Sequence, residues 1–255
     1  MAIQQYLNTT QVFTAEDFRR AFPDSVTDRN LLVRAVGNGR VDRLRRGLYV
    51  SRAEAYLHAK ASAFDIAAKA AGDAVFCLLS ALQLHGVLHN VSFRTMFYTA
   101  HKIARFEYDR QEYWPIRRPA APIEVRSLLT LAGRRYQVTT KEQTLVDCLD
   151  RVRLAGGPEN TLRSVGGFRQ FDMNHLLGIA ERSTNSLRAR LGWVLQAKAE
   201  EWNVDESTLT TLADSIGGGL HYLCPSARSA DRHWASRWRL YLPSPEQEMT
   251  SWLNQ

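Results

Sequence analysis

The first forty residues contain two short segments in which apolar residues recur at helical spacing. The first follows Thr14, a residue type that caps helices, and stops at Pro23, which cannot continue one. Its apolar positions 18, 21 and 22 share one face. The second segment, DRNLLVRAVGNG, ends in glycines of the kind that close helices. With Val12 and Phe13 predicted to be extended, we expect a short strand, a helix, a tight turn and a second helix.

The second predicted helix has two different faces. At about 100° per residue, its apolar positions 31, 32, 35 and 36 fall on one side. The opposite side contains Asn30, Val33, Arg34 and Gly37. Arg29 lies at the edge of this side, and Thr27 precedes the helix. A helix of this kind packs on its apolar side and can place its polar side in the major groove of DNA.

Two short alternating runs follow, around Arg45-Arg46-Gly47, and predict a β-hairpin. Helix, turn, helix and hairpin in this order are typical of a winged helix-turn-helix, in which the hairpin is the wing. We therefore predict such a DNA-binding domain over residues 1–52. The candidate DNA contacts are Thr27, Arg29, Asn30, Arg34, Arg40, Arg43, Arg45 and Arg46.

The distribution of arginine supports a polyanionic partner. The chain has a formal charge of +7 and an isoelectric point near 9.5. Residues 1–52 hold nine arginines, no lysine and five acidic residues, and six of the arginines lie between positions 29 and 46. Arginine donates paired hydrogen bonds to phosphates and to guanine, whereas a surface serving solubility alone mixes both signs of charge. A winged helix used only for binding proteins is the alternative.

The remainder of the chain is predicted to form an α/β segment, residues 53–157, and a mostly helical segment, residues 158–255. The expected elements are helices at 51–71, 78–86, 141–152, 176–180 and 187–197, strands near 91–99, 123–128 and 136–138, and a final strand in WRLYLP. The fold class is therefore α+β. Further basic positions, interpreted as a solvated face with nucleic-acid contact left open, are Arg188, Arg190, Arg228, Arg232, Arg237 and Arg239.

The composition indicates a folded protein, with 45% hydrophobic and 23% charged residues. Its longest apolar stretches are shorter than the roughly 20 residues that cross a bilayer, and its first residues lack the basic start and apolar core of a secretory signal. We therefore expect a cytoplasmic protein without membrane contact. Cys77, Cys148 and Cys224 stand singly, which favours reduced, structural thiols.

Motifs for catalysis or metal binding are weak. An ExK motif, which many nucleases need for Mg²⁺, and a Gly-Ser dipeptide, typical of nucleotidyltransferases, are both missing from the sequence. His221, Cys224 and His233 are too few and too far apart for a closed zinc site. His85 and Ser80 have no nearby carboxylate to orient them. We expect no catalysis and no cofactor, with an unrecognised nucleic-acid enzyme as a further alternative.

Five segments in a distinctive order resemble the AbiEi family of antitoxins and transcriptional regulators from bacterial type IV toxin–antitoxin and abortive-infection systems. They are RLRRGLYV at 43–50, SALQLHGV at 80–87, VTTKEQTLVD at 138–147, SLRARLG at 186–192 and WRLYLP at 238–243. The resemblance implies that the N-terminal winged helix represses the operon's own promoter by binding inverted repeats. It also implies that a C-terminal antitoxin domain counteracts a nucleotidyltransferase toxin, by a route that need not involve a stable complex.

Overall fold

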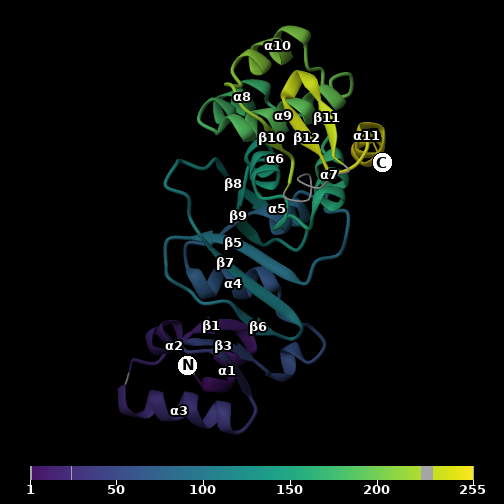
Figure 1. The fold of residues 1–255 in the computed structure, drawn as a ribbon. Helices are drawn as coiled ribbons and strands as arrows, with labels where there is room; N and C mark the ends of the chain where they lie inside the picture. The colour runs from purple at the N-terminus through teal and green to yellow at the C-terminus, as the bar shows by residue number, and fades with distance from the viewer. Residues whose placement is uncertain (1, 24, 225–231, 255) are drawn as a thin grey trace. The chain divides into compact units, whose positions relative to one another are not determined.

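The computed structural model describes residues 2–23, 25–224 and 232–254, and the side chains of residues 25–29 lie outside this description. The protein is of mixed α and β type, as predicted (Figure 1). Its chain divides into two compact units, one of Met1–Ala74 with Phe93–Arg118 and one of Val75–Ser92 with Pro119–Gln255. Among the helices in the described ranges, none combines the length and apolar character needed to cross a bilayer.

The first unit begins with three helices and a small antiparallel sheet. These elements are α1 (Ile3–Thr9), β1 (Val12–Thr14), α2 (Ala15–Ala21), α3 (Ser25–Gly37), β2 (Val41–Arg45) and β3 (Leu48–Ser51), with strand order β1-β3-β2. The predictions of α2, α3 and the hairpin are confirmed. Thr14 caps α2 in a reciprocal pair with Asp17, at 2.9 and 3.0 Å between backbone nitrogen and side-chain oxygen. Helix α1 was not predicted.

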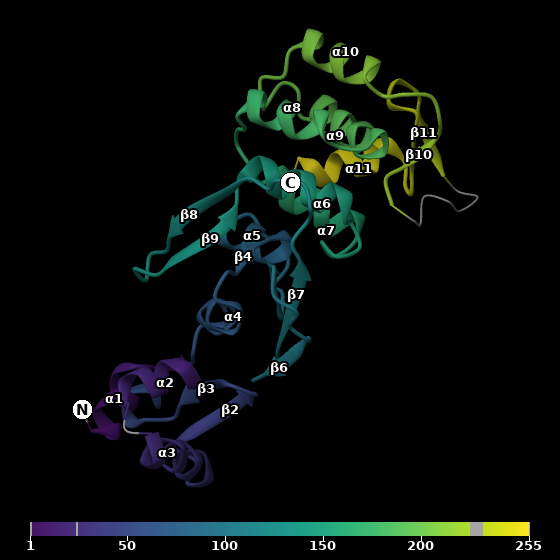
Figure 2. The ribbon, with the colours of Figure 1, turned by 90° about the vertical axis from the view of Figure 1, so that its left-hand side faces the viewer.

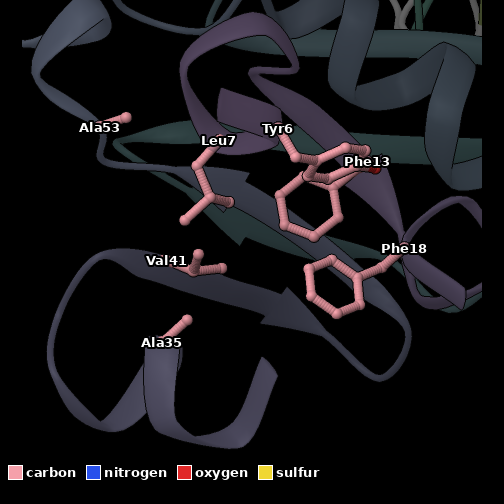
Figure 3. Close-up of a cluster of buried hydrophobic side chains, with 7 residues drawn as sticks. All are labelled: Tyr6, Leu7, Phe13, Phe18, Ala35, Val41 and Ala53. Carbon is pink, nitrogen blue, oxygen red and sulfur yellow. The ribbon is translucent and has the colours of Figure 1, made fainter. Parts of the chain in front are cut away.

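One buried cluster holds these elements together (Figure 3). Its members are Tyr6, Leu7, Phe13, Phe18, Ala35, Val41 and Ala53. The ring of Tyr6 meets Phe13 and Phe18 edge to face, with centroids 5.4 and 5.6 Å apart. Burying a phenylalanine side chain of this kind stabilises a fold by about 1.5–3 kcal/mol. Because Ala35 belongs to this cluster, the apolar side of α3 faces the core and its other side faces outward.

The rest of the first unit contains a short helical turn, one helix and three strands. They are η1 (Glu54–Tyr56), α4 (Ala63–Ala71), β5 (Arg94–Thr99), β6 (Phe106–Tyr108) and β7 (Gln111–Arg117), with β7 parallel to β5 and antiparallel to β6. The prediction of one helix over 51–71 was wrong, because Ser51 remains in the sheet through a hydrogen bond to Gln11 and α4 starts only after Ser62. Strand β7 escaped prediction because it contains Pro115.

The second unit is mainly helical. Its strands β4 (Val75–Phe76), β8 (Val125–Leu129) and β9 (Arg135–Thr139) form one group, with β9 parallel to β4 and antiparallel to β8. Its helices are α5 (Leu78–Leu84), α6 (Lys141–Asp150), α7 (Pro158–Gly166), α8 (Met173–Glu181), α9 (Asn185–Ala197), α10 (Glu206–Asp214) and α11 (Glu246–Leu253). A second small sheet has the order β10 (His221–Tyr222), β12 (Leu240–Leu242), β11 (His233–Ala235) (Figure 1). The short helical turn η3 (Ser236–Trp238) precedes β12. Figure 2 shows β10 and β11 beside α9.

Two arginines of α9 are structural. The guanidinium of Arg188 donates to the carbonyl oxygens of Ala180, Glu181 and Ser215 at 2.8–2.9 Å. That of Arg190 donates to the carbonyl oxygens of Leu149, Asp150 and Tyr222 at 2.8–3.2 Å. Most of these carbonyl groups lie at the C-terminal ends of α6, α8 and α10, and Arg190 also bonds strand β10 through Tyr222. The interpretation of these two positions as a solvated face was therefore wrong.

The arginines of the C-terminal segment have different surroundings. Arg237 forms an ion pair with Glu206 at 2.6 Å, whereas Arg232 and Arg239 are exposed. Arg228 lies outside the described residues. The solvated-face interpretation therefore applies to Arg232 and Arg239 alone among the described positions.

Candidate nucleic-acid interface

The outward side of α3 carries the polar groups that the sequence analysis assigned to it. Asn30, Arg34 and Gly37 are exposed, and the isopropyl group of Val33 between them is 65% exposed. On the inward side, Ala35 is buried, and the neighbouring leucines and valine are packed against the core. The prediction of the two helix faces is confirmed for these positions. Thr27 and Arg29, two of the candidate contacts, lie outside the described side chains.

A groove of about 850 Å³ lies among α2, α3 and the β2–β3 hairpin. Three arginines, Arg19, Arg43 and Arg46, line it together with apolar side chains. The apolar lining consists of Ala15, Phe18, Phe22, Pro23, Leu32, Val33, Val36 and Tyr49. The groove therefore combines an apolar floor with three positive charges, and it adjoins the outward side of α3 through Val33.

The cationic side chains at this groove are available for an anionic partner. Arg19, Arg43 and Arg46 are all exposed. Within the part of the chain that the structure describes, no carboxylate forms an ion pair with these three or with Arg34. By contrast, neighbouring Arg20 is paired with Glu16 at 3.0 Å. Unpaired guanidinium groups on one surface attract phosphates and release their counterions.

Arg45 has a different orientation from its neighbours in the hairpin. Its guanidinium carbon lies 5.6 Å from the centroid of the Phe106 ring, which itself stacks on Tyr113 at 4.4 Å. The register of β2 against β3 shifts between Arg43 and Arg45, and such an irregularity changes the side of the strand to which the following residue points. Arg45 is thus half-buried against β6, whereas Arg43 and Arg46 line the groove.

Arg40 is also partly engaged by the fold. Its guanidinium contacts the side-chain oxygen of Gln4, and its backbone nitrogen donates to Ala35 at the end of α3. Sequence reasoning missed Arg19, which α2 directs to the groove. Its spacing from Ala15 and Phe22 on the same helix, four and three residues, was the signal that could have found it.

A second cavity in the same unit, of about 520 Å³, is lined by charges that are already paired. Arg52 bonds Asp42 at 2.6 Å, and Lys60 bonds Asp109 at 2.7 Å. Burial raises the pKa of Tyr108 to about 12, and its hydroxyl donates to Asp42 at 2.9 Å. The bond between Tyr108 and Asp42 holds the hairpin to β6, and the pair of Lys60 and Asp109 holds the loop before α4 to the turn after β6, so a structural role explains them.

The residues weighed for metal or catalytic chemistry lie in the second unit, and among them His233 is exposed. His221 is buried, and this burial lowers its pKa. Over the described ranges, no three side chains of the metal-binding types come together. His85 lies 2.8 Å from the carbonyl oxygen of Thr139, and burial lowers its pKa as well. The three cysteines are buried and form no disulfide within the described ranges, and burial raises the pKa of Cys148.

Comparison with known proteins shows the fold. No family model matches the sequence, and no curated protein matches it. Among solved structures, the chain is similar to the crystal structure of the Rv2827c protein from Mycobacterium tuberculosis, with 14% sequence identity and a TM-score of 0.67. The match covers 98% of this chain and 93% of that one. The two proteins therefore share an α+β architecture over nearly their whole length.

Proposed function

We propose that the N-terminal elements form a winged helix-turn-helix that binds duplex DNA, with α3 as the recognition helix and the β2–β3 hairpin as the wing. The observation that carries this proposal is the groove beside the exposed side of α3, whose exposed Arg19, Arg43 and Arg46 form no ion pair with a carboxylate of the described residues. At 13 residues, α3 is about 20 Å long, and the major groove, about 12 Å wide, admits such a helix.

The three arginines and the helix would act on different parts of the duplex. Guanidinium groups from α2 and the wing neutralise phosphates and set the orientation of the protein on DNA. Asn30, Val33 and Arg34 would then meet base edges, because an amide pairs with adenine, an apolar group with the thymine methyl and a guanidinium with guanine. The guanidinium of Arg45 packs on the Phe106 ring, so Arg45 is not among the DNA contacts in this proposal.

We further propose that this protein is the antitoxin of a type IV toxin–antitoxin system. The resemblance of its five motifs to the AbiEi family supports this role, in which the winged helix represses the operon's own promoter at inverted repeats. The second unit would contain most of the antitoxin domain that counteracts a nucleotidyltransferase toxin. The apolar floor of the groove favours one alternative, a docking site for an acidic protein segment, because Phe22, Leu32 and Tyr49 would suit such a partner.

The test is binding of the full chain to duplex DNA from upstream of its own gene, measured by fluorescence anisotropy at several salt concentrations. The double variant Arg43→Ala, Arg46→Ala should bind more weakly by about 1–3 kcal/mol of free energy. The slope of log K against log salt should also fall by about 1.8, because each phosphate that a guanidinium neutralises contributes about 0.9 to it. Both effects follow because each guanidinium would displace counterions from the duplex.

The matched control is Arg169→Ala combined with Arg153→Ala, which removes the same charge from two exposed positions of the second unit. It should leave affinity and slope close to those of the parent protein. Equal weakening in both double variants would mean that net charge alone binds DNA. An unchanged slope in the Arg43, Arg46 variant would contradict the proposed interface.

A further inference from the structure

The small sheet of the second unit carries three aromatic residues in one row. In its register, Tyr222 of β10 and Trp234 of β11 are both direct partners of Tyr241 in the central strand β12. Direct cross-strand partners point to the same face of a sheet. The ring centroids of Tyr222 and Tyr241 lie 5.4 Å apart, and those of Trp234 and Tyr241 lie 4.7 Å apart.

This aromatic face is exposed mainly at Trp234, because Tyr222 and Tyr241 also pack against the buried pair Val152 and Cys224. The adjacent row consists of His221, Leu240 and Ala235, which are all buried, so that face packs into the unit. On the aromatic face, Trp234 is 43% exposed, and Tyr222 and Tyr241 are partly buried. An indole ring of this exposure presents apolar area and a π face to the solvent.

A cation accompanies the row. The guanidinium carbon of Arg232, which is exposed, lies 4.4 Å from the centroid of the Tyr241 ring. Among the described residues, no carboxylate pairs with Arg232. The face therefore offers rings in mutual contact with an exposed guanidinium beside them.

We propose that this face binds single-stranded nucleic acid, with bases stacking on Trp234 and Tyr241 and a phosphate held by Arg232. Aromatic rings accept any unpaired base because every base has a π face, and a cation beside them follows the backbone. Paired bases in a duplex do not expose these faces, so the site is distinct in substrate from the groove of the first unit. The charge of Arg232 favours a polyanion over the proline-rich peptides that also bind aromatic surfaces.

The experiment uses the full chain carrying Arg43→Ala and Arg46→Ala, so that the first unit contributes little. Fluorescein-labelled single-stranded RNA and DNA of mixed sequence are titrated, with anisotropy and tryptophan quenching as readouts. Trp234→Ala should weaken binding about 10-fold or more, because it removes a stacking surface, and Trp234→Phe should restore most of it. Arg232→Ala should reduce the salt slope by about 0.7.

The control is Phe93→Ala, which removes another exposed aromatic side chain, in the first unit. It should bind single strands as tightly as the starting chain with Arg43→Ala and Arg46→Ala does. If adding Trp234→Ala to that chain leaves its affinity for the RNA and for the DNA unchanged, the proposal is overturned. Quenching of Trp234 by a proline-rich peptide and not by either oligonucleotide would overturn it as well, in favour of a protein partner. Preference for RNA or for DNA would identify the natural strand.

Discussion

Two glycines lie in neighbouring helices, and replacing each by alanine should change the stability of the protein in opposite directions. Gly192 lies within α9, and a methyl group there would overlap Cε3, Cζ3 and Cη2 of the Trp238 indole. Trp238 is 1% exposed, and its Nε1 donates to Gln196 at 2.8 Å, so the indole has little room to move. Gly178 lies within α8, where the atom nearest to the added methyl group is the terminal Nη1 of Arg182 at 3.8 Å.

The magnitudes follow from packing and from helix propensity. In Gly192→Ala, overpacking costs about 2 kcal/mol and disturbing the indole hydrogen bond about 1 kcal/mol. Alanine returns about 1 kcal/mol of helix propensity, which leaves about 2 kcal/mol of net destabilisation. Gly178→Ala gains the same propensity without overlap and should stabilise the protein by up to about 1 kcal/mol. For a unit of this size the expected midpoint shifts are about −4 to −8 °C and about +2 °C.

Thermal unfolding followed by circular dichroism, with urea unfolding as a second measure, tests this pair of predictions. Each variant is compared with the parent protein at the same concentration and pH. An unchanged or raised midpoint in Gly192→Ala would refute the reasoning, because it would mean that the fit of Trp238 against α9 does not limit position 192. It would also remove the structural explanation for the glycine of the SLRARLG motif.

Three further predictions concern the first unit. Val33 is proposed to contact a thymine methyl group, which deoxyuridine lacks. Replacing thymine by deoxyuridine in the promoter should therefore weaken DNA binding by the parent protein about 3- to 10-fold and leave DNA binding by Val33→Ala unchanged. An anisotropy titration of both DNAs measures these affinities. Burial opposes ionisation of Asp17, but hydrogen bonds from Thr14 and Lys69 lower its pKa below 3.8, so it stabilises the protein above that pH. Urea unfolding from pH 7 to 2.5 should therefore show the stability advantage of the parent over Asp17→Asn shrinking as the pH falls below 3.8, whereas an advantage of equal size at pH 7 and at pH 2.5 would contradict it. Gly47 has φ +81° at the hairpin turn, so Gly47→Ala should cost about 1 kcal/mol in the same assay, and an unchanged stability would show that the turn can adapt.

Local signals explain the parts of the fold that were predicted. The capping pair of Thr14 and Asp17 lies within one turn of α2, and the side chain of Thr140 caps α6 by accepting from the backbone nitrogen of Gln143. Helix α1 carried a usable signal as well, since Ile3, Tyr6 and Leu7 follow the spacing of one helix face. Strand β7 carried a weaker signal, because a proline such as Pro115 argues against a strand. At Pro115 the strand pairs with β5 alone, since its pairing with β6 ends at Tyr113, and a proline is compatible with pairing on one side.

The candidate groove depended on contacts that are distant in sequence. The arginine cluster between positions 29 and 46 marked the region, but the register shift after Arg43 turns Arg45 toward Phe106, which lies far along the chain. In place of Arg45, the structure brings Arg19 from α2 to the groove. The same applies to Arg188 and Arg190, which looked like surface cations until the helix ends that they cap were in place.

The sequence by itself determined the order of the N-terminal elements, the apolar and polar sides of α3 and the excess of arginine around it. These depend on periodicity and capping, which act over a few residues. Only the tertiary structure decided which arginines share a groove and which support the fold, and only it placed three aromatic rings in one row of the second sheet. The physical reason is that the face to which a strand residue points follows from register, and register is set by pairing with distant segments.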